Sequence, residues 1–164
     1  ALIYVHRMDS MGSDLTVANA ARVSFDKHKD ELDSSDEKLI KYLAEHDHWS
    51  PFSHVSIQFK IDAPIFVARQ LQKHQVGLAW NEVSRRYVDT EPEFYSPIEW
   101  RRRMLLPQDM MTSWYWSGSV YAFSRVCNLR LKEDAQAETR EVAELISNSC
   151  AIIFPISWKH LTQG

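Results

Sequence analysis

The segment HVSIQFKIDAPIFVARQLQKHQ (residues 54–75) contains two patterns of apolar residues that belong to different secondary structures. Apolar side chains occupy every second position from Val55 to Ile61, and a period of two is typical of a strand with one buried face. Pro64 then stands where a helix would begin, and residues 64–75 have helical spacing that Gly77 would end. The segment therefore predicts a strand followed directly by a helix.

The sequence before this segment adds one strand and two helices. Residues 2–9 predict an opening strand, and residues 13–25 predict a short helix whose last residues are extended. A capping box of Ser34 and Glu37 predicts the start of another helix. Residues 30–37 are charged and lack apolar periodicity, so we expect an exposed face there.

The C-terminal part of the sequence predicts two mostly helical stretches, over residues 101–131 and 134–154. They would be joined by a turn near residues 132–134, with Asp134 as the cap of the second helix. Together with the predicted strands, these helices indicate the α+β class. Because the chain has 164 residues, we expect one domain over residues 1–164.

Composition excludes several classes of function. A net charge of −3 argues against a general nucleic-acid-binding protein. Cys127 and Cys150 are too few for a disulfide scaffold, and His46, His48 and His54 lack the spacing of a zinc site, so we expect no metal. The sequence contains no long apolar run, so we expect no signal peptide, no membrane span and a cytoplasmic protein.

Cations gather locally in RQLQKHQVGLAWNEVSRRYV (residues 69–88), where Glu82 is the only acid. Lysine and arginine neutralise phosphate, and arginine does so with two parallel hydrogen bonds. The amides and the carboxylate nearby supply the groups that recognise the edge of a base. The composition suits an anionic, planar ligand such as a nucleotide. A solvated helix end beside an edge strand with outward arginines is the alternative that the residues leave open.

Four blocks of the sequence resemble, in the same order, blocks of the flavin-dependent thymidylate synthases. AARVSF (residues 20–25) resembles a block near the N-terminus of that family, and HDHWSPFSH (residues 46–54) resembles its segment ending in PFEH. Residues 63–87, which end in NEVSRRY, resemble its signature region. Residues 128–138, with NLR and AQAE, resemble its C-terminal segment.

The resemblance implies a fold, a reaction and partners. The fold would be a small antiparallel sheet packed by helices, including two long C-terminal helices. The reaction would be the reductive methylation of dUMP to dTMP, with methylenetetrahydrofolate as the carbon donor and reduced FAD as the source of hydride. NADPH would reduce the flavin. The enzyme would be a homotetramer whose active sites are shared between subunits.

The resemblance also assigns residues to each ligand. Arg130 and His74 would be catalytic, with Arg130 activating the uracil by gripping its carbonyl edge, and Ser84 would bind rather than attack. The residues expected to bind dUMP are Gln70, Glu82, Val83, Ser84, Arg85, Arg86, Arg103 and Arg130. The residues expected to bind FAD are His48, Ser50, Ser53, Lys73, His74, Gln75 and Asn81. Ser119, Tyr121 and Arg125 also occupy positions that face the flavin in the family.

The sequence departs from the family pattern at several of these positions. Lys73 and Gln75 replace two motif arginines, and the loop from Gln75 to Ser84 is one residue longer. The chain is also shorter than the family between Tyr95 and Pro107. These departures leave two alternatives: a divergent enzyme that modifies C5 of a pyrimidine nucleotide differently, for example by hydroxymethylation, or a non-catalytic nucleotide-binding homologue.

Overall fold

The computed structural model describes residues 1–96 and 107–163, and in them one four-stranded antiparallel sheet is packed by helices. The strand order is β1-β2-β4-β3. The strands are β1 (Tyr4–Met11), β2 (Ser56–Pro64), β3 (Leu78–Glu82) and β4 (Met111–Ser119). The α-helices are α1 (Asp14–Arg22), α2 (Ser34–Glu45), α3 (Ile65–Leu71), α4 (Val120–Arg130), α5 (Ala137–Ile153) and α6 (Pro155–Thr162). Short 3-10 turns are η1 (Val23–Phe25), η2 (Ser50–His54) and η4 (Pro107–Asp109). This arrangement confirms the predicted α+β class.

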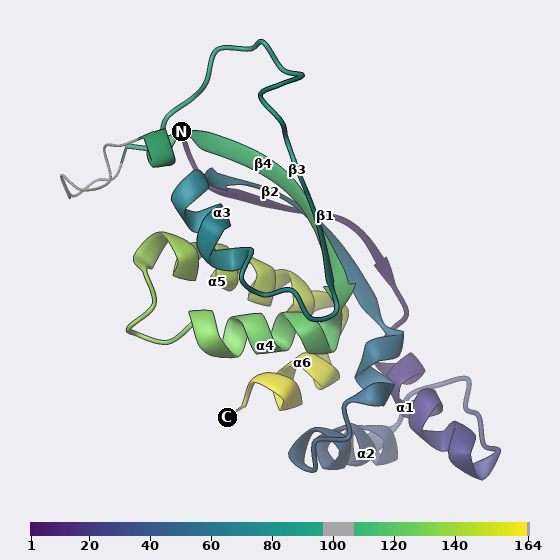
Figure 1. Ribbon diagram of the computed structural model, residues 1–164. Helices are drawn as coiled ribbons and strands as arrows, with labels where there is room; N and C mark the ends of the chain where they lie inside the picture. The colour runs from purple at the N-terminus through teal and green to yellow at the C-terminus, as the bar shows by residue number, and fades with distance from the viewer. Residues whose placement is uncertain (97–106, 164) are drawn as a thin grey trace.

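Helices α3, α4 and α5 cover one face of the sheet, while α1 and α2 lie beyond one end of it (Figure 1). The face toward the helices is apolar: Phe59 of β2 and Trp116 of β4 are fully buried, and both rings meet Phe123 of α4 edge to face, at 5.2 and 5.3 Å between centroids. The opposite face carries polar side chains such as Lys60 and Ser113. The period of two in residues 55–61 therefore places a strand as predicted.

The prediction that residues 101–131 are mostly helical is wrong for Met111–Ser119, which form the central strand β4. Thr112, Trp114 and Trp116 are buried while the residues between them are more exposed. Aromatic and β-branched side chains favour a pleated, half-buried surface. The first of the two C-terminal helices is therefore only α4.

The helix predicted over residues 64–75 is shorter than expected. Pro64 ends β2 and precedes the helix as its N-cap instead of its first residue. The helix α3 ends at Leu71, so Lys73 lies in a loop and shares no helical face with Phe66 and Gln70. Gly77 has a φ of 73° in that loop, a left-handed conformation that glycine adopts without strain.

Three predicted ends also differ by a few residues. The stretch after α1 is the 3-10 turn η1 and is not extended. The cap of α2 is Asp33 rather than Ser34, because the Asp33 carboxylate accepts from the Ser35 backbone N–H and Asp36 completes the box at the third helical position. The cap of α5 is Gln136 rather than Asp134.

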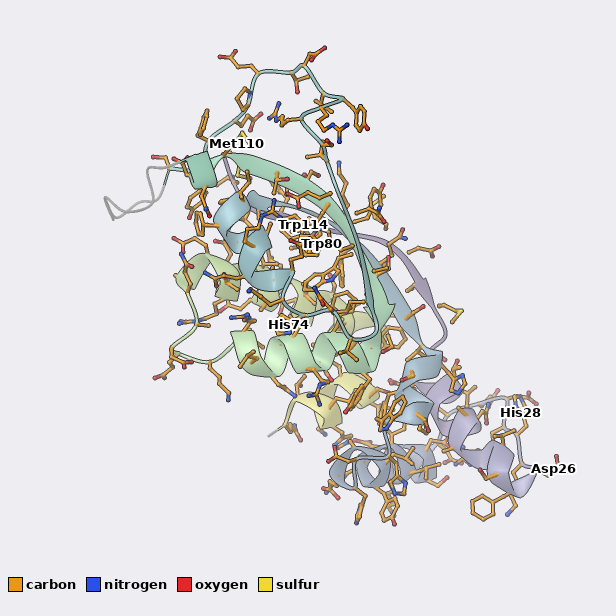
Figure 2. The ribbon with its side chains drawn as sticks, in the orientation of Figure 1. Asp26, His28, His74, Trp80, Met110 and Trp114 are labelled. Carbon is orange, nitrogen blue, oxygen red and sulfur yellow. The ribbon has the colours of Figure 1, made fainter. Side chains whose placement is uncertain are left out.

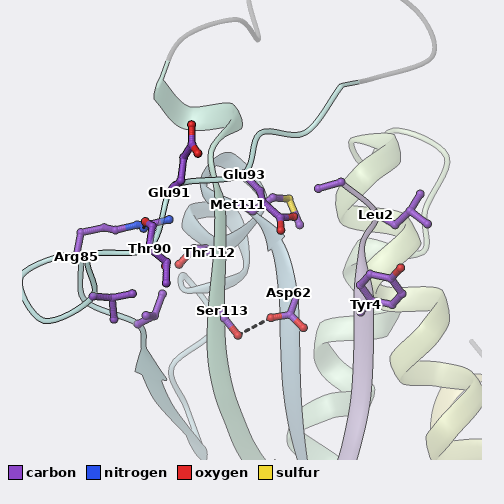
Figure 3. A pocket seen from close by; sticks show the side chains of 13 residues that line it. Leu2, Tyr4, Asp62, Arg85, Thr90, Glu91, Glu93, Met111, Thr112 and Ser113 are labelled. Carbon is purple, nitrogen blue, oxygen red and sulfur yellow. Dashed lines mark hydrogen bonds between the residues drawn. The ribbon is translucent and has the colours of Figure 1, made fainter.

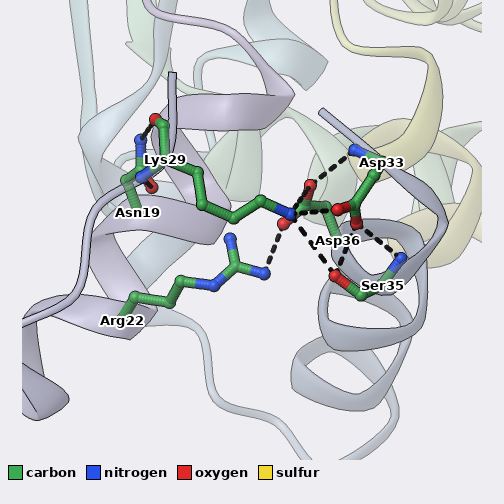
Figure 4. Close-up of polar contacts among 6 residues, drawn as sticks. All are labelled: Asn19, Arg22, Lys29, Asp33, Ser35 and Asp36. Atoms are coloured by element: carbon green, nitrogen blue, oxygen red, sulfur yellow. Dashed lines mark hydrogen bonds and ion pairs between the residues drawn. The ribbon is translucent and has the colours of Figure 1, made fainter. Parts of the chain in front are cut away.

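The prediction of an exposed face over residues 30–37 is wrong for Asp36, which is fully buried (Figure 4). Its carboxylate pairs with the Arg22 guanidinium and accepts from the Lys29 ammonium at 2.9 Å. Asn19 in turn holds the Lys29 backbone through two hydrogen bonds, of 2.8 and 3.0 Å. The charged loop is therefore tied to α1 and α2 by a polar network whose centre is removed from water.

Candidate functional site

Residues from α3, α4 and the loop after α3 meet on the helical side of the sheet. Arg130, in the last turn of α4, points its Nε at Nε2 of His74 at 3.0 Å, and its Nη2 donates to the backbone oxygen of Gln70 at 3.2 Å. Figure 2 shows His74 between α3 and α4. All three residues are half-buried. The structure thus brings together both residues expected to be catalytic and one expected to bind dUMP.

The environment of His74 favours the neutral imidazole. Burial, with the Arg130 cation as a second cause, lowers the pKa of His74 below its ordinary value of 6.5. A guanidinium has only donors, so Nε2 of His74 must be the acceptor, and the proton lies on Nδ1. The contact therefore requires a neutral His74.

Two residues at the start of α5 hold the side chain of Gln70. The hydroxyl of Thr139 donates to Gln70 Oε1 at 2.9 Å, and Gln70 Nε2 donates to Gln136 Oε1. Thr139 is fully buried, whereas Gln136 is half-buried. No motif or spacing in the sequence predicted a role for Thr139 or Gln136. The only signal was that Gln136 lies in the AQAE block.

Glu82, at the end of β3, has a carboxylate fixed from three sides. Thr112 Oγ1 donates to Glu82 Oε1 at 2.8 Å, and Arg69 Nη1 donates to Oε2 at 3.0 Å. Trp80 Nε1 adds a longer contact to Oε2, at 3.4 Å. Arg69 and Gln70 are neighbours at the end of α3, so one helix end contacts both the Glu82 carboxylate and the Arg130 guanidinium.

Residues 83–86, which follow Glu82 at the end of β3, border a cavity of about 620 Å³ (Figure 3). Val83, Arg85 and Thr112 line this cavity, and the hydrogen bond from Ser113 to Asp62, of 2.5 Å, crosses its floor on β4 and β2. Arg85 donates to the backbone oxygen of Thr90 at 2.5 Å. The cavity therefore lies beside the residues expected to bind a phosphate.

Ser84 and Arg86, in the same segment, have their own contacts. Ser84 Oγ accepts from the backbone N–H of Arg86 at 3.3 Å, and the Arg86 guanidinium lies 5.7 Å from the centre of the Tyr87 ring. Arg86 is exposed and Ser84 is half-buried. In the described part of the chain, no hydrogen bond joins Arg130 to residues 82–86.

The residues expected to bind FAD lie on two segments that border α4. His48, Ser50 and Ser53 are exposed in and before η2. The first segment carries an aromatic contact between Trp49 and Tyr121, at 6.0 Å between ring centres.

The second segment is the loop after α3. Its members Lys73, Gln75 and Asn81 are exposed, while His74 is half-buried. The loop runs along α4, since a side-chain carbon at Gly77 would lie 3.5 Å from Cβ of Ala122. Both segments therefore border α4 without forming one closed pocket in the described residues of a single chain.

The remaining expectations concern Arg103, a metal site and a membrane span. Arg103 lies in residues 97–106 and hence outside the described residues. Across residues 1–96 and 107–163, no group of three or more histidine, cysteine, aspartate or glutamate side chains is placed to hold a metal ion. None of the helices described is long and apolar enough to cross a membrane.

The chain matches the family model described as thymidylate synthase complementing protein over residues 8–102 and 101–156. The chain is 32% identical to the flavin-dependent thymidylate synthase of Thermotoga neapolitana over 204 aligned residues, which cover 98% of this chain and 93% of the relative. That alignment is longer than this chain, so the relative carries residues that this chain lacks. The two family matches meet at residues 101–102, within the stretch where a shorter chain is expected.

Two solved structures of a nucleotide methylase are also similar to this chain. The chain is similar to PolB from Streptomyces cacaoi, a UMP/dUMP methylase, in a crystal structure bound with 5-Br dUMP: the TM-score is 0.86 and the identity 27%, over 99% of this chain and 95% of that one. For the structure of PolB bound with 5-Br UMP, the TM-score is 0.82 and the identity 26%.

Proposed function

Because the chain belongs to the thymidylate synthase complementing protein family, we propose that it is a flavin-dependent thymidylate synthase, which methylates dUMP to dTMP. The observation that carries this proposal is the contact of Arg130 with His74 and with the backbone oxygen of Gln70. Two segments that the family resemblance selected separately, residues 63–87 and 128–138, meet there. Chance similarity between short sequence blocks gives no reason for them to converge.

The uracil and the phosphate would be held by different residues. Arg130 and Gln70 present N–H donors to the uracil, and a cation beside a carbonyl oxygen stabilises the negative charge that develops as C5 becomes nucleophilic. Arg85 and Arg86, with Ser84 as a donor, bind the phosphate. Arg103 joins this set by its place in the family pattern. No enzymic nucleophile is required.

The exposed residues of the loop after α3 and of η2 fit FAD by their chemistry. Lys73 supplies a cation for the pyrophosphate, and the amides of Gln75 and Asn81 supply donors for the carbonyls of the flavin ring. His48, Ser50 and Ser53 supply further polar groups, and His74 lies where the loop meets Arg130. When bound, FAD supplies the hydride that completes the methyl group. Lys73 binds phosphate as a point charge, without the planar fork of an arginine.

The residues assigned to dUMP lie on α3, α4 and the segment after β3, and most of the FAD set is exposed in a single chain. This exposure supports active sites completed by neighbouring copies in a homotetramer. Methylenetetrahydrofolate is the carbon donor and NADPH reduces the flavin, both in the cytoplasm. Residues 1–164 act as one domain in this arrangement.

The proposal is tested by incubating the purified protein with dUMP, FAD, methylenetetrahydrofolate and NADPH, and by measuring the mass of the nucleotide product. A gain of one methyl group supports the proposal. A hydroxymethyl product would replace it with the divergent enzyme, and a protein that binds dUMP without turnover and without FAD would replace it with the non-catalytic homologue.

Methylation of UMP is the second candidate function. The similarity to PolB favours this function, because PolB is a UMP/dUMP methylase. The similarity extends over 95% of the PolB chain. Competition between UMP and dUMP in one reaction, followed by separation of the two products, measures the ratio of their kcat/KM values. A large preference for dUMP would exclude UMP as a main substrate.

A further inference from the structure

A second cavity, of about 180 Å³, lies where the end of α2, one face of α4 and α6 come together. Its lining is mostly polar, and it shares no lining residue with the cavity that residues 83–86 border. A pocket that encloses a whole small-molecule ligand usually has about 300–1,000 Å³. This cavity is smaller, so it suits a single ring system that forms one end of a larger molecule.

Two aromatic rings and a guanidinium line this cavity side by side. Trp49 is 53% exposed, and the centre of its ring lies 6.0 Å from that of Tyr121. The Cζ of Arg125 lies 5.9 Å from the centre of the Tyr121 ring. An exposed aromatic face binds a planar base by stacking, and a guanidinium beside it binds phosphate. The three side chains thus offer groups for a base and for a phosphate at one place.

Two further lining residues have hydrogen-bonding groups to spare. The Asp47 carboxylate makes no hydrogen bond or ion pair with any residue that the structure describes. Asn128 Nδ2 donates to the backbone oxygen of Leu161 at 2.9 Å, and because a carbonyl can only accept, this contact fixes the orientation of the amide. The other N–H and the oxygen of Asn128 remain for a ligand.

These groups match the hydrogen-bonding edge of adenine. An amide pairs with adenine through two bonds, to the exocyclic amine and to a ring nitrogen. The Asp47 carboxylate accepts only, so it favours the amine at position 6 of adenine over the carbonyl at position 6 of guanine. The polar groups of the cavity therefore favour adenine among the purines.

The cavity is separate from the contact between Arg130 and His74. Tyr121, Arg125 and Asn128 are spaced by four and three residues, so they share one face of α4. Arg130 follows Tyr121 by nine residues, which is about two and a half helical turns, and it therefore lies on the opposite face. A ligand in the cavity is thus on the far side of α4 from the proposed base-binding arginine of the same chain.

We propose that this cavity binds an adenine nucleotide, with the base against Trp49 and a phosphate against Arg125. The family resemblance assigns no role to Trp49, Asp47 or Asn128. The inference rests on the proposed function only for the source of the nucleotide, because FAD and NADPH both carry an adenylate group. Since the cavity faces away from Arg130, the rest of such a cofactor extends toward a neighbouring copy.

The experiment measures the dissociation constants of ADP, GDP and adenosine by calorimetry, with no dUMP present. Trp49→Ala should weaken the binding of ADP and adenosine by about tenfold or more, because the stacking face is lost, and Trp49→Phe should keep most of the affinity. Arg125→Ala should weaken ADP more than adenosine, which has no phosphate. Phe94→Ala removes an aromatic side chain that is 52% exposed, nearly the exposure of Trp49, and should change nothing.

Three results would overturn the inference: no binding of ADP by the wild-type protein at millimolar concentration, equal affinities for ADP and GDP, or full ADP affinity in Trp49→Ala. Should Trp49→Ala lose its cooperative thermal transition, Arg125→Ala decides instead, since Arg125 is exposed. An unchanged ratio of ADP to adenosine affinity in that variant overturns the inference.

The same variants identify the source of the nucleotide. If Trp49→Ala binds FAD more weakly but FMN as tightly as the wild type does, the adenylate belongs to FAD. A loss confined to NADPH assigns it to NADPH, and a loss of neither overturns the inference. ADP binding of the expected pattern in a protein that makes no methylated nucleotide would remove only the proposed function. Methylation of dUMP by a protein whose ADP binding ignores Trp49→Ala would remove only the inference.

Discussion

Nε of Arg130 donates to Nε2 of His74 over 3.0 Å, and this pairs a group that is always charged with one that must stay neutral. The pair is compatible with folding because burial and the Arg130 cation together lower the pKa of His74. A protonated His74 would offer a second donor to the guanidinium and would repel it. The geometry of the proposed catalytic arginine is therefore linked to the protonation of its neighbour.

The first prediction concerns pH. The folded-state pKa of His74 lies below 6.5, so on acidification the unfolded chain binds this proton before the folded chain does. The free energy of unfolding should therefore be highest above about pH 6.5 and decrease as the pH falls below it. Denaturant unfolding at a series of pH values measures this slope. His74→Gln removes the titrating group, and an identical slope in that variant would contradict the assignment.

The second prediction concerns Arg130. Arg130→Ala should lower kcat by about 10²–10³-fold, because a donor aimed at developing charge is lost. The thermal transition should change little, since Arg130 is only half-buried. Lys132→Ala, at an exposed position in the turn after α4, is the matched loss of a cation and should leave kcat unaltered. Normal turnover by Arg130→Ala would remove the proposed mechanism.

The third prediction concerns the support of Glu82. Thr112→Val removes the hydroxyl that donates to Glu82 Oε1 at 2.8 Å, while Arg69 keeps its contact with the other oxygen. The KM for dUMP should rise about fivefold to tenfold, because one hydrogen bond that orients the carboxylate is lost. Thr162→Val, which makes the same change in α6 where the hydroxyl bonds the backbone of its own helix, is the control. Steady-state kinetics that give equal KM values for both variants would argue against a role for Glu82 in dUMP binding.

The fourth prediction concerns the buried carboxylate of Asp36. Asp36→Asn should lower the free energy of unfolding by about 3 kcal/mol, because the Arg22 guanidinium is left without its counter-charge in a site that is largely shielded from water. Asp33→Asn, at an exposed carboxylate on the same Lys29, should cost less. Urea unfolding of both variants compares them, and equal losses would show that burial of Asp36 contributes nothing.

The fifth prediction concerns Gly118 in β4. A Cβ at this position would lie 2.6 Å from the backbone oxygen of Gly77 and 2.5 Å from Leu78 Cδ2, so the loop after α3 would have to move. Gly118→Ala should therefore lower the free energy of unfolding by about 1–3 kcal/mol and weaken FAD binding, since that loop carries Lys73, His74 and Gln75. At Gly77 itself the space is adequate, and Gly77→Ala tests the φ of 73° alone. Binding that is unaffected in Gly118→Ala would show that the loop position is not critical.

The sequence by itself determined the α+β class and strand β2, and its resemblance to a family supplied the residues of the proposed site. The strand could be predicted because a period of two over Val55–Ile61 depends only on which side chains face the core. The site residues came from short blocks that resemble those of the flavin-dependent thymidylate synthases. Strand β4 could not be predicted in this way, because neighbouring aromatic residues pack equally well on a helix or in a sheet, and pairing with β2 and β3 decides between them.

Only the tertiary structure decided which site residues touch and which polar groups hold them in place. His74 and Arg130 are 56 positions apart, and Gln70 and Thr139 are 69 apart, so neither contact leaves a local signal in the sequence. The burial of Asp36, within a charged stretch of sequence, likewise leaves no local signal. A hydrogen bond between distant residues requires the packing of α3, α4 and α5 on one sheet, and the spacing of residues along the chain does not encode that geometry.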